Sequence, residues 1–583
     1  MDITTDSLKN QGYTVKKEGP TIVLYQNGSS KRVGFYKNDW DKSIRKLEEK
    51  LADAGVPRLI IEAVKASMSA NYLKLTNGSA TSGTAVSSSQ QQLMMAPNAT
   101  PANCTMEEWK TALKAKYEHL KQIAEEQIPG LWLPLEFAIS VRCIMHIKDI
   151  SLPFIAIILG PPSSNKTIAV DQFKGARYTF TTDHFSPKAF VSHVSGLTEE
   201  QLQKIDLLPK IKNKMFLTSE LSPLFTTKDD DLANVFGIIT RIADGNGYFN
   251  ESGAQGHRGY AGPLMFVWLG AAVDIPYKVH KLLSALGPKL YFIRLPSYTR
   301  SQEDIVLLLQ HSNFRQRLET VGKAFYDYLE CLESCPDMKP DPELGNIPRL
   351  EWNTANPVEK EAQILIANLT ELLRRLRGTV STWETTGTQG LDYSYSSPCI
   401  EDSPRAATQL YNLARGHALS QGRDYITVDD DLPLITKVVL SGAASIERVR
   451  VLGALLDNTT DAGYIDVSDL ADAINVSPNT AKRVMAEFRA LDLAEVINIG
   501  ESEEKPIWQM RLKDDLSWFL TEEFRNLKGD YMPGDFTRYV PVNKKDRKKN
   551  TPQREQKNNP SDGDIGIDTY GNTDEEEKEG GAN

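Results

Sequence analysis

The sequence predicts an α/β protein built around a parallel β-sheet, and two patterns support this prediction. Residues 105–300 alternate apolar runs of strand length with stretches of helical periodicity, which is typical of α/β domains. Residues 154–159 are continuously apolar, as expected for a strand buried on both faces of a parallel sheet. A glycine, a short polar loop and a new helix follow this run directly. We therefore expect a central strand that leads into a ligand-binding loop.

Length and charge exclude several classes of protein. The chain has 583 residues, a formal net charge of −10 and 40% hydrophobic residues, which predicts three or four domains with sizeable cores. An acidic balance argues against a histone-like or coat-like nucleic-acid binder, although it leaves room for a local basic patch. The five cysteines are few and scattered, which indicates a reducing compartment. Cys331 and Cys335 have no second Cys/His pair nearby, so we expect no zinc site.

No targeting or membrane segment is expected from the sequence. The amino terminus lacks a basic region followed by an apolar run, which argues against a signal peptide. No apolar stretch reaches the roughly 20 residues that span a bilayer. We therefore expect a cytoplasmic protein with no membrane partner.

Composition divides the chain into six parts. Residues 1–74 predict a small α/β module, in which residues 21–25 and 32–36 form a hairpin about Asn27-Gly28, followed by a helix over residues 40–54. Residues 75–103 are rich in Ser, Thr, Asn, Gln and Ala and predict a disordered linker. The remaining parts are an α/β core over 105–300, a largely helical region over 301–440, a compact unit over 445–530 and a disordered charged tail over 540–583. The tail contains a basic run over 544–549 that could contact nucleic acid.

The loop after the 154–159 strand is a candidate phosphate-binding loop. Its residues are Gly160, Pro161, Pro162, Ser163, Ser164, Asn165, Lys166 and Thr167. In this strand–loop–helix setting, backbone N–H groups curl around phosphate. Lys166 would neutralise the β- and γ-phosphates of ATP, and the Thr167 hydroxyl would ligate Mg²⁺. Asn165 replaces the usual second glycine, and Asn tolerates the left-handed conformation better than other non-glycine residues. The alternative is an ordinary strand-to-helix turn.

A second apolar strand, residues 215–218, leads to Ser219 and Glu220. P-loop ATPases place an acidic pair at the end of such a strand, in which the Asp helps to hold Mg²⁺ and the Glu polarises the attacking water. Ser219 takes the Asp position and is therefore a candidate Mg²⁺ ligand. Glu220 is the candidate catalytic base. The loss of the Asp would weaken Mg²⁺ binding or slow turnover. The alternative is that Glu220 is a surface residue at the end of a strand.

The order of these elements resembles the AAA+ superfamily, especially the branch of the minichromosome-maintenance helicases and their mobile-element relatives. A predicted helix over 232–243 is followed by a glycine-rich hairpin over 244–260 and an apolar strand over 264–272. In that branch a hairpin before this strand points into the central channel and grips DNA. The resemblance makes His257 and Arg258 candidate DNA contacts, although by themselves they are simply polar hairpin residues.

The resemblance extends to a helical lid. Residues 403–431 are similar to the AAA+ lid, in which an Arg at the start of a helix reaches the γ-phosphate, and Arg405 holds that place. Alternatively, Arg405 is a solvated residue in a first helical turn, where the helix dipole disfavours cations. The family's sensor residue is missing or shifted to Asp274, and Arg294 or Arg300 would have to replace its arginine finger. The resemblance covers residues 105–440 apart from about 335–395.

Residues 445–512 resemble a winged helix-turn-helix. Three helices are expected over 445–456, 467–474 and 478–491, and strands over 494–499 and 507–512 flank an acidic loop in the place of the wing. The start of the third helix presents polar residues where a recognition helix contacts bases and phosphates. These candidate DNA contacts are Asn479, Thr480, Lys482 and Arg483. The acidic loop would repel a phosphate backbone, so protein contact is the alternative.

The sequence therefore predicts a P-loop AAA+ core with a parallel sheet and a helical lid, a small α/β amino-terminal module and a carboxyl-terminal winged helix. The resemblance implies an ATPase that binds ATP and Mg²⁺ and acts on DNA, as a helicase or replication-initiation motor of a replicon or mobile element. It also implies a homo-oligomeric ring, because hydrolysis in this superfamily draws on a neighbour's arginine. The alternatives are an ATP-binding, DNA-binding regulatory switch with weak or no hydrolysis, and a degenerate P-loop that serves only as scaffold.

Overall fold

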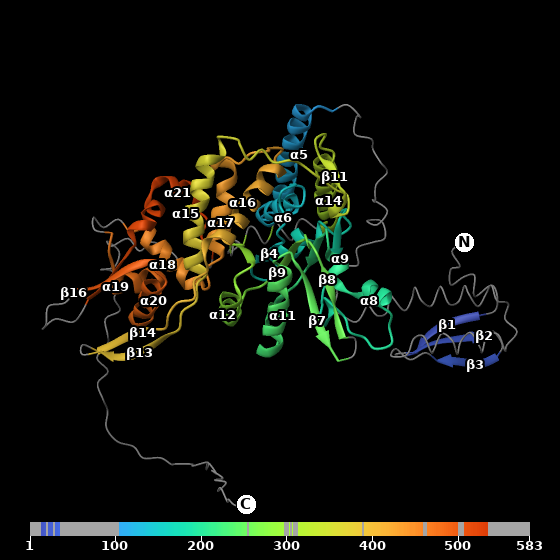
Figure 1. Cartoon of the computed structure of the whole chain (residues 1–583), viewed down its shortest axis with the longest axis horizontal. Helices are drawn as coiled ribbons and strands as arrows, with labels where there is room; N and C mark the ends of the chain where they lie inside the picture. The colour runs from blue at the N-terminus through green and yellow to red at the C-terminus, as the bar shows by residue number, and fades with distance from the viewer. Residues whose placement is uncertain are drawn as a thin grey trace, which may run out of the picture. The chain divides into compact units, whose positions relative to one another are not determined.

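The computed structural model divides the chain into two units, Met1–Asn98 and Ala99–Asn583 (Figure 1). The residues that it describes are 13–18, 21–26 and 29–34, and 104–533 apart from 254–255, 297–301, 303–305, 307–312, 388–389, 459–462 and 500–506. The helix expected over 40–54, the linker over 75–103 and the charged tail over 540–583 lie outside the described residues.

The first unit contains a three-stranded antiparallel sheet. Its strands, in the order β1-β2-β3, are β1 (Tyr13–Glu18), β2 (Thr21–Gln26) and β3 (Ser29–Gly34). Gln26 of β2 pairs with Ser29 of β3, so two residues, Asn27 and Gly28, join the strands. This confirms the hairpin that the Asn-Gly pair predicts. Asn-Gly is a preferred sequence for hairpin connections of two residues.

A five-stranded parallel sheet forms the centre of the second unit, which confirms the predicted fold class. Its order is β10-β4-β9-β6-β5, and every described pairing within it is parallel. The strands are β4 (Phe154–Leu159), β5 (Thr179–Thr181), β6 (Met215–Thr218), β9 (Val267–Ala272) and β10 (Leu290–Arg294). β5 was not predicted, because its three half-buried residues form no apolar run.

Strand β4 is buried on both faces, as its unbroken apolar sequence predicts. Alternate residues point to opposite sides of a strand, and Phe154 and Ile158 accordingly join one hydrophobic core, whereas Ile155 and Leu159 join a second. The sheet therefore separates two cores, and the end of β4 is a rigid platform for the loop that follows it.

Helices cover both faces of the sheet (Figure 1). The core that contains Phe154 is lined by α5 (Met106–Gln127), α6 (Trp132–Ile144), α7 (Lys166–Asp171), α14 (Phe314–Glu333), α15 (Glu359–Arg377), α16 (Ser403–Ser420) and α17 (Val428–Ser441). The core that contains Ile155 is lined by α9 (Leu207–Ile211), α11 (Asp229–Ile242) and α12 (Tyr277–Leu286). The shorter elements are η1 (Pro187–Ala189), α8 (Glu199–Ile205), α10 (Ser222–Phe225), β11 (Lys339–Asp341), η2 (Pro342–Leu344) and β12 (Ile347–Arg349).

Helix α5 shows how the sequence specifies these helices. Thr105 and Glu108 form a capping box at its start, which satisfies backbone N–H groups that the first turn leaves unpaired. The buried side chains recur every three or four residues: Trp109, Leu113, Tyr117, Leu120 and Ala124. The Trp109 ring N–H donates to the Cys331 carbonyl of α14 over 2.8 Å, so the two helices are fixed against each other.

The predicted hairpin before β9 is present as β7 (Gly247–Ser252) and β8 (Gly256–Ala261). Gly259 is required where the strands cross closely, because a Cβ atom there would lie 2.2 Å from the Tyr248 carbonyl oxygen. A second hairpin, β13 (Thr382–Gly387) with β14 (Gly390–Tyr395), was not predicted and packs against α20 (Pro478–Ala490).

The remaining predicted helices and strands of the carboxyl-terminal region are also present. They are α18 (Ile446–Leu456), α19 (Val467–Ile474), α20, β16 (Ala494–Ile499) and β17 (Ile507–Leu512), joined by β15 (Ile465–Asp466), η3 (Asp514–Leu520) and α21 (Glu522–Lys528). The strands form an antiparallel sheet in the order β15-β17-β16. The Ser477 side chain caps α20 by accepting from the Thr480 N–H, as predicted. Within the described part of the chain, every helix is too short or too polar to cross a membrane.

Candidate nucleotide-binding site

The predicted phosphate loop leaves the carboxyl end of β4 at Gly160. The Gly160 N–H donates to the Ala272 carbonyl of the neighbouring strand over 3.2 Å. A Cβ atom at this position would lie 2.6 Å from the Ser164 hydroxyl and 3.2 Å from the Leu295 Cβ. Glycine is therefore required here because the loop folds back over its own first residue.

Asn165 takes the conformation for which the usual glycine is needed. Its φ is 65° and its ψ is 0°, in the left-handed region, and Ser163 also has a φ of 65°. The Asn165 side-chain amide donates to the Pro129 carbonyl over 3.0 Å, which ties the loop to the segment before α6. The expectation that asparagine supports a left-handed residue at this point is confirmed, and the amide adds an anchor that glycine lacks.

Lys166 begins α7 and is almost completely buried. Its ammonium donates to the Pro161 carbonyl over 3.0 Å, within the loop. Burial lowers the pKa of Lys166, and the negative charge of Glu220 acts against that shift. The structure therefore brings these two predicted residues, which are far apart in the sequence, to the same edge of the sheet.

Glu220 lies two residues after the end of β6. One of its carboxylate oxygens accepts from the Ser222 backbone N–H over 2.9 Å, which orients the side chain. Trp268 of β9 donates to the Thr218 hydroxyl over 3.2 Å and fixes the end of β6. The Glu220 side chain is partly accessible to solvent, as a candidate general base that contacts water must be.

Ser219 is buried, and its hydroxyl donates to the Asp171 carboxylate over 2.8 Å. Asp171 closes α7 and lies four residues after Thr167, so both side chains belong to one helix face. Hydroxyl and carboxylate oxygens from Thr167, Ser219 and Asp171 are the donor types that Mg²⁺ prefers. The donor set therefore fits this cation, although the sequence analysis missed its carboxylate.

A cavity of about 350 Å³ opens beside the loop. It is lined by residues of the loop and α7, by the segment before α6 and by the start of α14: Ile128, Pro129, Ser163, Ser164, Asn165, Lys166, Thr167, Ile168, Phe314 and Arg317. The Ser164 hydroxyl is buried without a hydrogen-bond partner among the described residues, so it can form a hydrogen bond with a ligand. None of the described residues that line this cavity is acidic, which suits an anionic ligand.

Arg405 lies elsewhere, which corrects the role that the resemblance gave it. It forms a 2.8 Å ion pair with Asp244 and donates to the Ala243 carbonyl over 2.8 Å. Asp244 also pairs with Lys289, which precedes β10, and the adjacent Gly245 lies against Pro153, which precedes β4. These contacts place Arg405 at the amino-terminal edge of the parallel sheet, opposite the phosphate loop. The helix α16 is present as predicted, but its orientation relative to the sheet places its first turn at the edge away from the loop.

Asp274 and Arg294 form a 2.6 Å ion pair at the carboxyl ends of β9 and β10. These strands flank β4, so the pair lies at the same sheet edge as the loop. The Arg294 side chain is largely buried, and its backbone carbonyl accepts from the Tyr531 hydroxyl over 2.7 Å. Arg294 is therefore engaged within its own chain, and Arg300 lies outside the described residues.

The two predicted hairpin contacts have different environments. Arg258 is buried and pairs with Asp206 over 2.7 Å, so the structure corrects its assignment as a DNA contact and makes it a support of the hairpin. Burial alone would raise the pKa of Asp206, but hydrogen bonds from Arg258 and Tyr260 hold it below its usual range. His257 is exposed, pairs with Glu251 over 2.6 Å and stacks on the exposed Phe249 ring at 5.0 Å.

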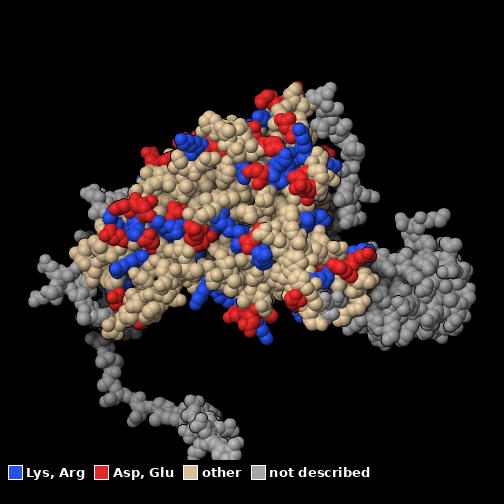
Figure 2. Space-filling model, viewed as in Figure 1, with Lys and Arg blue, Asp and Glu red and all other residues tan. Residues whose placement is uncertain are grey.

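The four predicted residues at the start of α20 lie near one another. Asn479 is exposed, and the Thr480 hydroxyl is 2.9 Å from that of Ser477. Lys482 lies 5.0 Å from the centre of the Trp508 ring of β17, and Arg483 pairs with Glu487 over 2.7 Å. On the face of the molecule shown in Figure 2, Lys and Arg side chains are interspersed with Asp and Glu. A DNA contact there would depend on these few residues rather than on a broad positive field.

Sequence reasoning missed three residues of the site. Asp171 could have been found from its four-residue spacing from Thr167. Phe314 and Arg317 gave no signal, because only tertiary packing brings α14 to the loop. Among the described residues, no group of three His, Cys, Asp or Glu side chains could hold a metal ion, and the Cys335 thiol lies 3.7 Å from the Met106 sulfur.

No protein-family model and no curated protein matches the chain. Among solved structures, a candidate ATPase from Cytophaga hutchinsonii is similar at 11% identity and a TM-score of 0.29, over 58% of this chain and 88% of that one. The SCCmec type IV Cch active helicase has 12% identity and a TM-score of 0.27, over 87% and 94%. The Aeropyrum pernix ORC1 protein in complex with DNA has 11% identity and a TM-score of 0.17, over 72% and 92%.

Proposed function

We propose that this chain is an ATP-binding AAA+ ATPase that acts on DNA, as a helicase or replication-initiation type motor of a replicon or mobile element. One observation carries the proposal: a phosphate loop with a left-handed Asn165 presents Lys166, within reach of the Glu220 charge, at the carboxyl edge of a parallel sheet. Ligands of α/β proteins bind at this edge.

Within this proposal, the loop binds the triphosphate. The backbone N–H groups of residues 163–167 and the Lys166 ammonium hold the β- and γ-phosphates. A bound Mg²⁺ would supply charge neutralisation of the phosphates and would be held by Thr167, with Ser219 and Asp171 as further oxygen donors. Lys166 is already buried in the loop, so little reorganisation is needed when the phosphates bind.

Glu220 is the proposed catalytic base. Its carboxylate orients a water molecule for attack on the γ-phosphorus and takes up a proton from it. The hydrogen bond from the Ser222 N–H occupies one carboxylate oxygen and leaves the other for the water. A positioned base of this kind contributes about 10²- to 10⁴-fold to a rate.

DNA contacts are assigned to two surfaces. The exposed Phe249 and His257 of the hairpin offer stacked rings, which suit unpaired bases or the sugar–phosphate backbone. Asn479, Thr480, Lys482 and Arg483 at the start of α20 form the second surface, which we interpret as the recognition end of a winged helix-turn-helix. A homo-oligomeric ring is part of the proposal, because hydrolysis in the AAA+ superfamily draws on a neighbour's arginine.

One observation favours a second candidate function. Ser219 replaces an acidic residue, so the carboxylate beside the metal position comes from Asp171 on another element. A site altered in this way suits an ATP-binding, DNA-binding switch in which nucleotide changes assembly or DNA affinity and hydrolysis is slow.

An ATPase assay with and without single- and double-stranded DNA separates these functions. For a motor, we expect DNA to stimulate turnover, Lys166→Ala to abolish ATP binding, and Glu220→Gln to keep ATP binding while turnover falls about 100-fold or more. ATP binding without DNA-stimulated turnover would indicate the switch. Unchanged ATP binding by Lys166→Ala would contradict both functions.

A further inference from the structure

We propose that Phe314 and Arg317, in the first turn of α14, are the nucleotide-recognition pair of this chain. Arg317 contacts the phosphates, and Phe314 stacks against the base. This inference rests on the proposed ATP site and adds to it the elements that hold the rest of the nucleotide.

The position of the pair is the first argument. Phe314 and Arg317 line the same cavity as the phosphate loop, together with Ile128 and Pro129. Among the described residues that line it, Lys166 and Arg317 are the two cations and none is acidic. A ligand with an anionic end at Lys166 therefore meets Arg317 as a second positive charge, and no described lining carboxylate competes for it.

The hydrogen-bonding state of Arg317 is the second argument. Its Nε is buried without a hydrogen-bond partner, and Arg317 makes no salt bridge with any described residue. A buried donor left unpaired costs free energy, which a ligand acceptor would recover. A guanidinium is planar and can donate two parallel hydrogen bonds to a phosphate, so a phosphate is the acceptor that best fits this fork.

The exposure of Phe314 is the third argument. Phe314 is 47% exposed although it lies in a cavity wall, and the Arg317 guanidinium lies 5.7 Å from the centre of its ring. A base has apolar faces that stack on an aromatic ring and on the side chains of Ile128 and Pro129. The pair thus offers a ring for the base and a cation for the phosphates within one helical turn.

Contacts between α14 and the segment after α7 fix the position of α14 relative to the loop. Phe325 of α14 packs edge-on against Phe173, two residues after the end of α7, with the ring centres 4.8 Å apart. The Tyr326 hydroxyl donates to the Lys174 carbonyl over 2.7 Å. Because α7 begins within the phosphate loop, these contacts connect α14 to the loop through one short segment.

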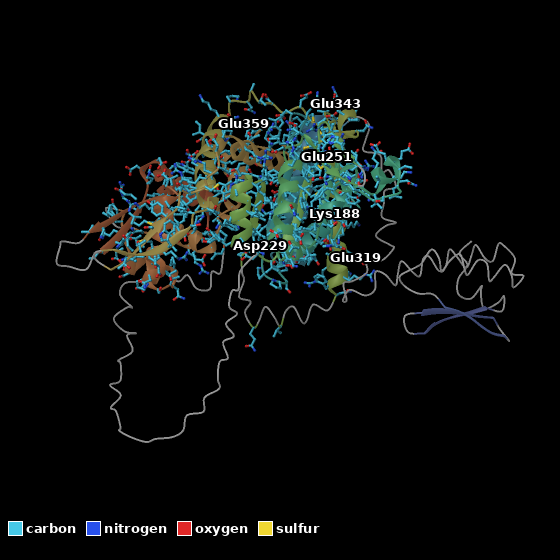
Figure 3. All side chains as sticks on the ribbon, turned by 60° about the horizontal axis from the view of Figure 1, so that its bottom comes forward. Lys188, Asp229, Glu251, Glu319, Glu343 and Glu359 are labelled. Carbon is cyan, nitrogen blue, oxygen red and sulfur yellow. The ribbon has the colours of Figure 1, made fainter. Side chains whose placement is uncertain are left out.

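Arg315 provides a matched control on the same turn. It is exposed and pairs with Glu319 over 3.1 Å, and it does not line the cavity. Figure 3 labels Glu319 on this helix. Replacement of Arg315 removes the same charge from the same helix turn without touching the proposed contact.

The test measures binding to the full-length chain. A fluorescent ATP analogue is displaced by ATP and, separately, by inorganic tripolyphosphate, which has the phosphates but no base. We expect Arg317→Ala to weaken both competitors by about 10-fold or more, as the loss of a charge-assisted hydrogen bond predicts. Phe314→Ala should weaken ATP by about 10-fold and leave tripolyphosphate unchanged. Arg315→Ala should change neither.

The outcomes separate this inference from the function on which it rests. If the wild type binds no ATP, the proposed function fails. If the wild type binds ATP and Lys166→Ala does not, while Arg317→Ala and Phe314→Ala bind as the wild type does, the recognition pair alone is wrong. Equal losses for both competitors in both variants would overturn the division of roles. Should Arg317→Ala fail to fold, Arg317→Lys decides, because it keeps the charge but not the fork and should bind tripolyphosphate less tightly than the wild type.

Discussion

The Ser219 hydroxyl donates a 2.8 Å hydrogen bond to the Asp171 carboxylate. The bond joins the end of β6 to the end of α7, the helix that begins in the phosphate loop. A carboxylate is thereby present beside Ser219, which stands where P-loop ATPases place the Asp of their acidic pair, before Glu220. The second negative charge expected after β6 is instead provided by a helix that already carries Thr167.

This relationship predicts that Asp171→Asn weakens metal binding. Asp171 is a proposed oxygen donor and the hydrogen-bond partner of Ser219, and loss of such a partner alone typically costs 10- to 100-fold in metal affinity, so we expect the Mn²⁺ affinity of the ATP complex to fall by about 10-fold or more. Electron paramagnetic resonance of free Mn²⁺ measures this directly. Lys174→Ala is the comparison: Lys174 pairs with Asp171 over 2.8 Å, so its removal frees the carboxylate and should not lower the affinity. Equal affinities for Asp171→Asn and the wild type would refute the assignment.

The left-handed Asn165 predicts a graded response to substitution. Asn165→Gly should keep ATP affinity within about threefold, because glycine adopts positive φ readily, although the bond to Pro129 is lost. Asn165→Val should lower ATP affinity about tenfold or more, because a β-branched residue in this conformation costs on the order of 1–3 kcal/mol. Isothermal titration with ATP checks both variants. A valine variant that binds as tightly as the glycine variant would show that the loop conformation is not required.

The hairpin β7–β8 predicts opposite behaviour for two adjacent residues. Arg258→Ala should lower the free energy of unfolding by about 3–5 kcal/mol, because it leaves the buried Asp206 carboxylate without its ion pair. His257→Ala should change it by no more than about 0.5 kcal/mol, since His257 is exposed, while affinity for single-stranded DNA falls. Urea denaturation and fluorescence anisotropy measure the two quantities. A destabilised His257→Ala with unchanged DNA affinity would mean that the exposed ring serves the fold alone.

His417 predicts a loss of stability on the alkaline side. Burial alone would lower its pKa, but hydrogen bonds with Asp431 and Glu136 raise it to about 9. Its ordinary pKa is about 6.5, so the unfolded chain loses the proton first as the pH rises. The stabilising contribution is therefore complete below about pH 6.5 and is lost as the pH rises through about 9.

Within that window the free energy of unfolding should fall by roughly 1.4 kcal/mol per pH unit. The other groups around His417 do not titrate there: Arg423 pairs with Asp431, the pKa values of Asp431 and Glu136 are lowered, and the pKa of Tyr117 is raised well above 10. Urea denaturation at a series of pH values gives the slope. The control is His417→Gln, whose slope should be smaller by this amount. Parallel curves for the two proteins would show that His417 carries no charge in the fold.

The parts of the fold that could be predicted are those with a local physical cause. The run over residues 154–159 predicts a strand buried on both faces, Asn27-Gly28 predicts a hairpin, and Ser477-Pro478 predicts a helix start, and all three are present. In each case the residues themselves favour the conformation, through burial, positive φ or capping. Strand β5 was missed because parallel pairing with β6 creates it without an apolar run of its own.

The sequence by itself determined the candidate phosphate loop, its cation Lys166, the acidic Glu220 and the elements on which they lie, because these depend on neighbouring residues. Tertiary structure alone decided which other charged groups reach the loop. Arg405 begins a helix as expected, but it pairs with Asp244 at the opposite sheet edge, whereas Arg317 lines the cavity beside the loop. Asp171 reaches Ser219, which lies 48 residues further along the chain. A long charged side chain pairs with the group that tertiary packing brings near it. That packing depends on contacts between elements, which no local sequence pattern encodes.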